Sequence, residues 1–203
     1  LVDLTARYEL YHFNNLLSGN GPIDVRLGNQ HYVSYHFKIH FNSQNREYFT
    51  SSGARFETEY GLYTDNFVKY NDHNPFSVVS ARWQIAFRLN NRLVLQPMAY
   101  GRVVWGDDIP LCQFNVVGSE MFGHYFSQQM PFSGINNVEY VENAFVGCQF
   151  QLQQRIMDNN YLAFAMSLGE ANDKLKDIFQ SKLMHGYRFT YSYDSFFGPL
   201  GAT

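Results

Sequence analysis

Apolar and polar side chains alternate with a period of two residues along most of this chain. Between residues 184 and 195 the odd positions are aromatic, namely Tyr187, Phe189, Tyr191 and Tyr193. The even positions there are small, polar or charged, namely Gly186, Arg188, Thr190, Ser192 and Asp194. Successive residues of a β-strand point to opposite faces of the sheet, so this period predicts strands with one apolar and one polar face.

The same alternation marks about nine segments of the chain. In chain order they are 4–13, 30–41, 54–63, 79–89, 93–105, 144–153, 162–168, 184–195 and 198–203. Several run for ten residues or more, whereas soluble strands are commonly about five or six and a tilted membrane strand needs about 9–11. We therefore expect an all-β fold, an antiparallel transmembrane β-barrel.

The connections between these segments differ in length. Residues 90–91 and 158–160 read as tight turns, while 14–29, 65–75, 106–137 and 169–182 are long. Short turns at one end and long loops at the other are typical of outer-membrane barrels, as is the aromatic content of 18%. The sequence therefore predicts a multi-pass barrel in the outer membrane of a Gram-negative bacterium, with membrane lipid as a partner.

Alternation alone does not say which face is inside, because a soluble lipid-binding barrel also alternates. An arginine at the membrane midplane costs roughly 2–4 kcal/mol, whereas aromatic side chains tolerate lipid. We therefore predict that the parity carrying Phe37, Trp83, Phe150 and Tyr191 faces lipid. The opposite parity, which carries Arg82, Arg88 and Arg188, should face the lumen.

Composition and spacing argue against several kinds of site. The net charge of −3 gives no basis for nucleic-acid binding. His36 and His40 share a face, but four strand residues separate them by about 13 Å, too far for one metal ion. Cys112 and Cys148 form no close-spaced pair; a disulfide between them and two inert thiols both remain open. We expect no cofactor and no metal.

The chain also lacks a pattern for catalysis. Ser119 is not part of a Gly-x-Ser-x-Gly elbow, which a serine hydrolase needs to expose its nucleophile. Glu57 and Glu59 are neighbours on one strand face, and Arg82 and Arg88 on the next strand are the expected neutralising charges. We therefore expect no enzymatic activity from this chain itself.

Three motifs carry a resemblance to a known superfamily. Residues 193–200, Tyr-Asp-Ser-Phe-Phe-Gly-Pro-Leu, resemble the aromatic-x-Ser-Pro-x-Gly-Pro-Leu turn of the BamA/TamA-type outer-membrane assembly superfamily, with Phe196 in place of the first proline. Residues 48–53 resemble its aromatic-Pro-Thr-x-Gly strand start, and 117–125 occupy the place of its glycine-rich inward loop. The resemblance implies a strand-turn motif made of Asp194, Ser195, Gly198, Pro199 and Leu200.

Residues 128–135, Gln-Gln-Met-Pro-Phe-Ser-Gly-Ile, resemble more specifically the C-terminal barrel domain of patatin-like phospholipases. That resemblance implies that residues 1–203 are a single barrel domain, incomplete at both ends, covering about the seventh to fifteenth strands of a sixteen-stranded wall. It also implies an attached lipase domain upstream. Because nine is an odd count, we expect this chain alone to form an open, curved sheet.

The region from 118 to 135 is the candidate functional site, since its superfamily counterpart folds back into the lumen. The residues expected in this lumen-folded loop are Gly118, Gly123, His124, Tyr125, Gln128, Gln129, Pro131 and Phe132. The expected partners on the inner wall are Glu142, Gln151, Arg188 and Asp194. A polar lumen offers hydrogen-bond partners to a re-entrant backbone, which lipid does not.

Three functions follow from these expectations. The first is an outer-membrane wall that anchors, and translocates, an attached patatin-like lipase domain. The alternative is an assembly factor of the BamA/TamA type, which would carry periplasmic domains. The second alternative is a diffusion porin, which would lack a plug-like loop. The sequence leaves the oligomeric state open.

Overall fold

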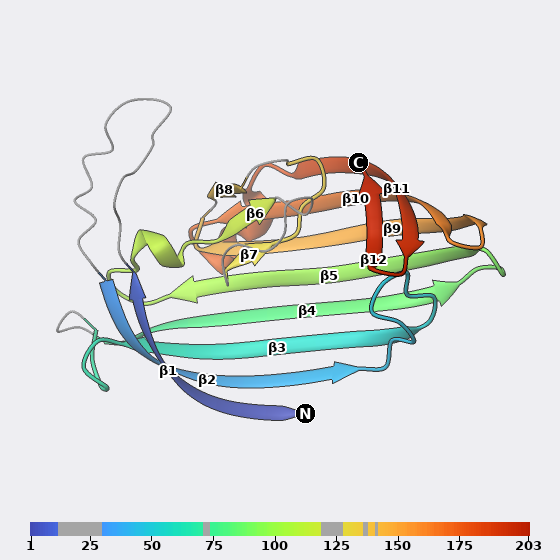
Figure 1. The fold of residues 1–203 in the computed structure, drawn as a ribbon. Coiled ribbons are helices and arrows are strands. Elements are labelled where there is room, and N and C mark those ends of the chain that lie inside the picture. The colour runs from blue at the N-terminus through green and yellow to red at the C-terminus, as the bar shows by residue number, and fades with distance from the viewer. Residues whose placement is uncertain (12–29, 71–73, 119–127, 136–137, 141) are drawn as a thin grey trace.

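Nine strands form one antiparallel sheet in the computed structural model, which describes the chain except for residues 12–29, 71–73, 119–127, 136–137 and 141. In sheet order the strands are β1 (Val2–Tyr11), β2 (Gln30–Asn42), β3 (Gly53–Thr64), β4 (Phe76–Arg88), β5 (Leu93–Trp105), β9 (Ala144–Met157), β10 (Asn160–Asn172), β11 (Met184–Ser195) and β12 (Gly198–Ala202). Figure 1 shows that the sheet is strongly curved. The predicted all-β, antiparallel fold is confirmed.

Five shorter elements lie in the connections. The 3-10 helix η1 (Leu111–Gln113) precedes β6 (Val116–Gly118), β7 (Gln129–Met130) and β8 (Val138–Tyr140), which form a small separate sheet. A second 3-10 helix, η2 (Leu175–Gln180), follows β10. Neither helix of the described part is long and apolar enough to cross a membrane. The small sheet was not predicted, because strands of two or three residues carry no readable alternation.

The strands present their aromatic parity outward. Trp83 is 51% exposed and Phe150 is 44% exposed, while Arg102 on the opposite parity is only 5% exposed. Phe37 and Tyr191 are likewise exposed. The predicted assignment of outer and inner faces is therefore confirmed, and it does not fit the soluble-barrel alternative, which would carry its charges outside. That the outer face meets lipid stays a prediction.

The two ends of the sheet order do not meet. β1 pairs only with β2, and β12 pairs only with β11, within the described strands. The predicted open sheet is confirmed for this chain. The sixteen-stranded wall of which it would form a part stays a prediction.

The connections sort by length to opposite ends of the sheet. Residues 89–92, 158–159 and 196–197 are tight turns at one end, which we call the short-turn end. The β2–β3 connection, residues 43–52, lies at the same end but is longer, and Figure 1 shows it rising from β2 toward β11 and β12. The end of this connection is marked in the sequence by Gly53, whose φ of +105° only glycine tolerates well.

Two buried clusters fill the concave side of the sheet. One is mostly aromatic and consists of Tyr32, Tyr63, Tyr70, Phe76, Val78, Val104 and Cys112. The other joins the wall to the 106–135 region and consists of Met98, Tyr100, Val117, Met130, Phe132 and Phe145. Cys112 and Cys148 are both free, so the open question of a disulfide is answered in favour of thiols. The second cluster positions the candidate site.

Candidate lumen site

The segment 131–134 is bonded directly to the inner wall. The Tyr100 hydroxyl of β5 donates a hydrogen bond to the carbonyl of Pro131. The backbone N–H of Ser133 donates to Ser167 Oγ of β10 at 3.1 Å, and Gln149 Nε2 of β9 donates to Ser133 Oγ at 3.2 Å. Three neighbouring strands therefore hold this segment, as expected for irregular backbone inside a barrel.

Glycines of the wall make room for this segment. Gly169 lies on β10, where a Cβ would lie 3.0 Å from the Phe132 ring, and Gly186 faces Ser167 across β10 and β11. A Cβ at Gly186 would lie 1.9 Å from the Ser133 carbonyl oxygen, far inside any allowed contact. Glycine lets the backbone of the segment approach the strands closely at these positions. We call Gly169 and Gly186 the glycine seat.

A buried cation of the wall holds the start of the same region. Arg102 of β5 donates to the Gln113 carbonyl at 2.8 Å, to Asn115 Oδ1 at 2.8 Å and to Gln113 Oε1 at 3.2 Å. Asn115 Nδ2 in turn donates to the carbonyls of Arg102 and Glu142. A buried guanidinium needs such acceptors, because leaving it unpaired is costly. We call this group the Arg102 clamp.

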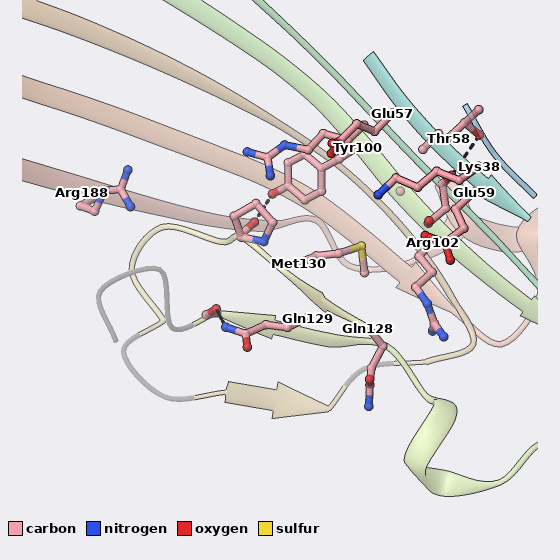
Figure 2. Close-up of a pocket in the computed structure, with 16 residues that line it drawn as sticks. Lys38, Glu57, Thr58, Glu59, Tyr100, Arg102, Gln128, Gln129, Met130 and Arg188 are labelled. Carbon is pink, nitrogen blue, oxygen red and sulfur yellow. Dashed lines mark hydrogen bonds between the residues drawn. The ribbon is translucent and has the colours of Figure 1, made fainter. Parts of the chain in front are cut away.

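A cavity of about 450 Å³ lies between the wall and residues 128–131. Figure 2 shows Gln128, Gln129 and Met130 on the side of the inward segment and Tyr100 on the wall. Six charged side chains line it: Lys38, Glu57, Glu59, Arg82, Arg102 and Arg188. The lumen is therefore polar, charged and partly filled by the chain's own loop.

The two carboxylates of this cavity have partners beyond those the sequence predicted. Glu57 bonds Arg55 at 2.9 Å, and Glu59 lies 2.7 Å from His36 Nδ1 and 3.7 Å from Arg7. Arg82 does face Glu57 across the β3–β4 ladder. The expectation for Arg88 was wrong, because β4 ends there and its guanidinium donates to Ser51 at the short-turn end.

The predicted loop residues fall in three groups. Gly118, Gln128, Gln129 and Pro131 line the cavity, with Gln128 Nε2 donating to the Cys112 carbonyl. Phe132 is 2% exposed and packs edge-on against Phe145. Gly123, His124 and Tyr125 lie outside the described residues. The role assigned to the loop stays a prediction.

The four predicted wall partners do not form one site. Gln151 Oε1 accepts from Arg188 at 3.3 Å on the inner face, whereas Asp194 lies 3.9 Å from Arg46 at the short-turn end. Glu142 is exposed beyond the wall, where a hydrogen bond with Asp173 raises the pKa of its carboxyl. Chain position alone did not reveal that these residues lie at different depths.

The strand-turn motif forms the tight β11–β12 turn. Ser195 Oγ donates to the Gly198 carbonyl and accepts from the Phe197 N–H at 3.3 Å. Gly198 has a φ of +113°, which explains glycine at this place. Asp194 and Ser195 pair with Pro199 and Gly198 in the register. The serine closes the turn locally, so its part is structural.

Sequence reasoning missed the residues that hold the site together. Arg102, Ser133 and Ser167 had not been singled out, although Arg102 lies on the polar parity of its strand and that parity was the available signal. The glycine seat had no such signal, because a glycine in a strand more often marks a bulge or a weak point.

Comparison with known proteins gives one family. The family model of the OMP85 superfamily matches residues 7–203. No curated protein matches the chain.

Proposed function

Because the chain belongs to the OMP85 superfamily, whose proteins are barrels of the Gram-negative outer membrane, we propose that it forms an anchoring wall for an attached domain. The superfamily is non-enzymatic, which agrees with assigning no catalysis to this chain. The main support is that two segments are attached to the inner wall. The Arg102 clamp holds residues 111–118, and hydrogen bonds hold residues 128–135 against the glycine seat.

An inward segment held in this way supports anchoring or gated export over free diffusion. Its described residues lie against β5, β9, β10 and β11, and Phe132 and Met130 are buried in contact with the wall. A diffusion porin needs a water-filled channel. Conductance of the full-length protein in a planar bilayer tests this point: we expect small, infrequent openings, and a steady large conductance would favour the porin.

The attached domain that we propose is a patatin-like lipase. Support comes from the resemblance of residues 128–135, which here are hydrogen-bonded to the wall at Pro131 and Ser133. Mass spectrometry of the full-length protein purified from outer membranes should find a Gly-x-Ser-x-Gly peptide continuous with the barrel. The same preparation should hydrolyse a fluorescent phospholipid.

The second candidate is an assembly factor, which membership of the superfamily itself favours. Periplasmic repeats in place of a hydrolase domain would support it. Depletion of the protein would then reduce the amounts of other barrels in the outer membrane. Unchanged amounts, together with lipase activity, would leave the anchoring function.

A further inference from the structure

A second, smaller cavity lies at the short-turn end of the sheet, away from the lumen site. Its volume is about 200 Å³, and the β2–β3 connection, the β4–β5 turn and the ends of β5, β9 and β10 surround it. Pockets for drug-sized ligands measure about 300–1,000 Å³, so this one suits a small ligand. We call it the arginine pocket, after the residues that line it.

Four arginines line this cavity: Arg46, Arg88, Arg92 and Arg155. None of the residues that line it is acidic. Arg46 lies 3.9 Å from Asp194, while Arg88 donates to the neutral Ser51 Oγ at 2.8 Å. Throughout the described residues, no carboxylate lies within ion-pair distance of Arg88, Arg92 or Arg155. Like charges around one cavity repel unless an anion joins them.

The arginines stand around a buried floor. Val94, Gln153 and Tyr161 line the same cavity and are each 5–6% exposed, whereas all four arginines are exposed. Arg88 lies on the same inward-facing side of β4 as Arg82, and Arg155 lies on the same inward-facing side of β9 as Gln153. Exposed guanidinium groups can therefore contact a ligand that rests on this buried base.

The β2–β3 connection is fixed rather than loosely draped over this floor. Phe49 stacks on Tyr161 with ring centroids 4.1 Å apart, and Gln96 Nε2 donates to the Thr50 carbonyl at 2.7 Å. Asn45 Oδ1 accepts from the N–H groups of Ser51 and Ser52 at 3.0 and 3.1 Å. These bonds set the positions of Arg46 and Ser51, so the pocket is preorganised.

We propose that the arginine pocket binds a phosphate-bearing anion. Guanidinium groups present paired N–H donors that match phosphate oxygens, and Ser51 and Asn91 add neutral polar groups to the lining. Short turns lie on the periplasmic side of outer-membrane barrels, so the pocket lies at the periplasmic end of the wall. Free phosphate and a glycerophospholipid headgroup present the same chemistry there. The proposal does not depend on which domain the wall carries.

The test uses the full-length protein in detergent micelles and isothermal titration calorimetry. One arm adds inorganic phosphate, and the other adds dihexanoyl-phosphatidylglycerol below its micelle concentration, with dihexanoylglycerol as the phosphate-free comparison. Binding of inorganic phosphate identifies a free anion as the ligand. Binding of the phospholipid alone identifies the headgroup. No binding in either arm up to millimolar concentration overturns the proposal.

The variant Arg88→Gln/Arg92→Gln/Arg155→Gln should weaken binding at least about tenfold, since charge-assisted hydrogen bonds to phosphate are lost. A matched control removes three exposed cations near η2, Lys174→Gln/Lys176→Gln/Lys182→Gln, at the opposite end of the sheet. The control should bind as the wild type does. Equal weakening in both variants would mean unspecific charge attraction and would overturn the proposal.

A single substitution keeps the test valid if the triple variant does not fold. Arg92 lies in the β4–β5 turn, and its described hydrogen bonds use backbone atoms only. Arg92→Gln should therefore leave the barrel intact and still weaken binding several-fold. Wild-type affinity in a folded Arg92→Gln protein would overturn the proposal.

Discussion

Replacing Gly186 with alanine should lift residues 131–134 from the inner wall. The new Cβ would lie 1.9 Å from the Ser133 carbonyl oxygen, and that atom has to move by roughly 1 Å before the contact reaches 3.0 Å. Such a shift takes the Ser133–Ser167 and Gln149–Ser133 hydrogen bonds, now 3.1 and 3.2 Å, out of range. Two hydrogen bonds at about 0.5–1.5 kcal/mol each give a cost of about 1–3 kcal/mol.

Hydrogen exchange of the Ser133 amide measures this cost directly, because that N–H donates one of the two bonds. A loss of about 1–3 kcal/mol corresponds to a fall in protection of roughly 5- to 150-fold. Conductance in a planar bilayer should rise in parallel, as a displaced segment fills less of the lumen.

The matched control is Gly201→Ala on the neighbouring strand β12. Its Cβ would meet first the Ser192 side-chain oxygen at 3.1 Å, which can rotate away, and no part of the inward segment. Protection of Ser133 should stay at the wild-type level in this variant. If Gly186→Ala also leaves it unchanged, the segment is not seated on these glycines and the reasoning fails.

Three further outcomes can be checked. Arg102→Met should destabilise residues 111–118 by about 2–4 kcal/mol, because buried carbonyl and amide acceptors lose a charged donor. Amide hydrogen exchange should become faster in that segment alone. An equal increase throughout the chain would contradict this expectation. The raised pKa of Glu142 means that its contact with Asp173 stabilises the folded state most at low pH. That stabilisation should disappear as the pH rises through the folded-state value, and Glu142→Gln should abolish the dependence in an exchange titration. Trp83→Arg, on the outer face, should cost about 2–4 kcal/mol and reduce folding into vesicles, whereas Ser80→Arg on the inner face of the same strand should fold normally. Equal folding of the two arginine variants would contradict the assignment of the outer and inner faces.

The sequence by itself determined the strands and their faces. Alternation is a local property, so the bounds predicted for β5 and β11 agree with the structure at both ends. The same parity placed Trp83 outward and Arg82 inward, since a strand that crosses lipid cannot exchange its faces without exposing charge.

Only the tertiary structure decided what fills the lumen. The bonds from Gln96 to Thr50 and from Ser133 to Ser167 join residues 46 and 34 positions apart. Thr50 and Ser133 lie in recognisable motifs, but neither motif says which strand residue it will meet. Gly186 illustrates the difference: in the sequence it is one small residue on the polar side of a strand, and in the fold the Ser133 carbonyl packs against it. The alternation of apolar and polar residues reports which face of a strand is outside and which is inside. The position of a connection that packs on the inner face depends on contacts with residues far away in the sequence, and no short stretch of sequence contains that information.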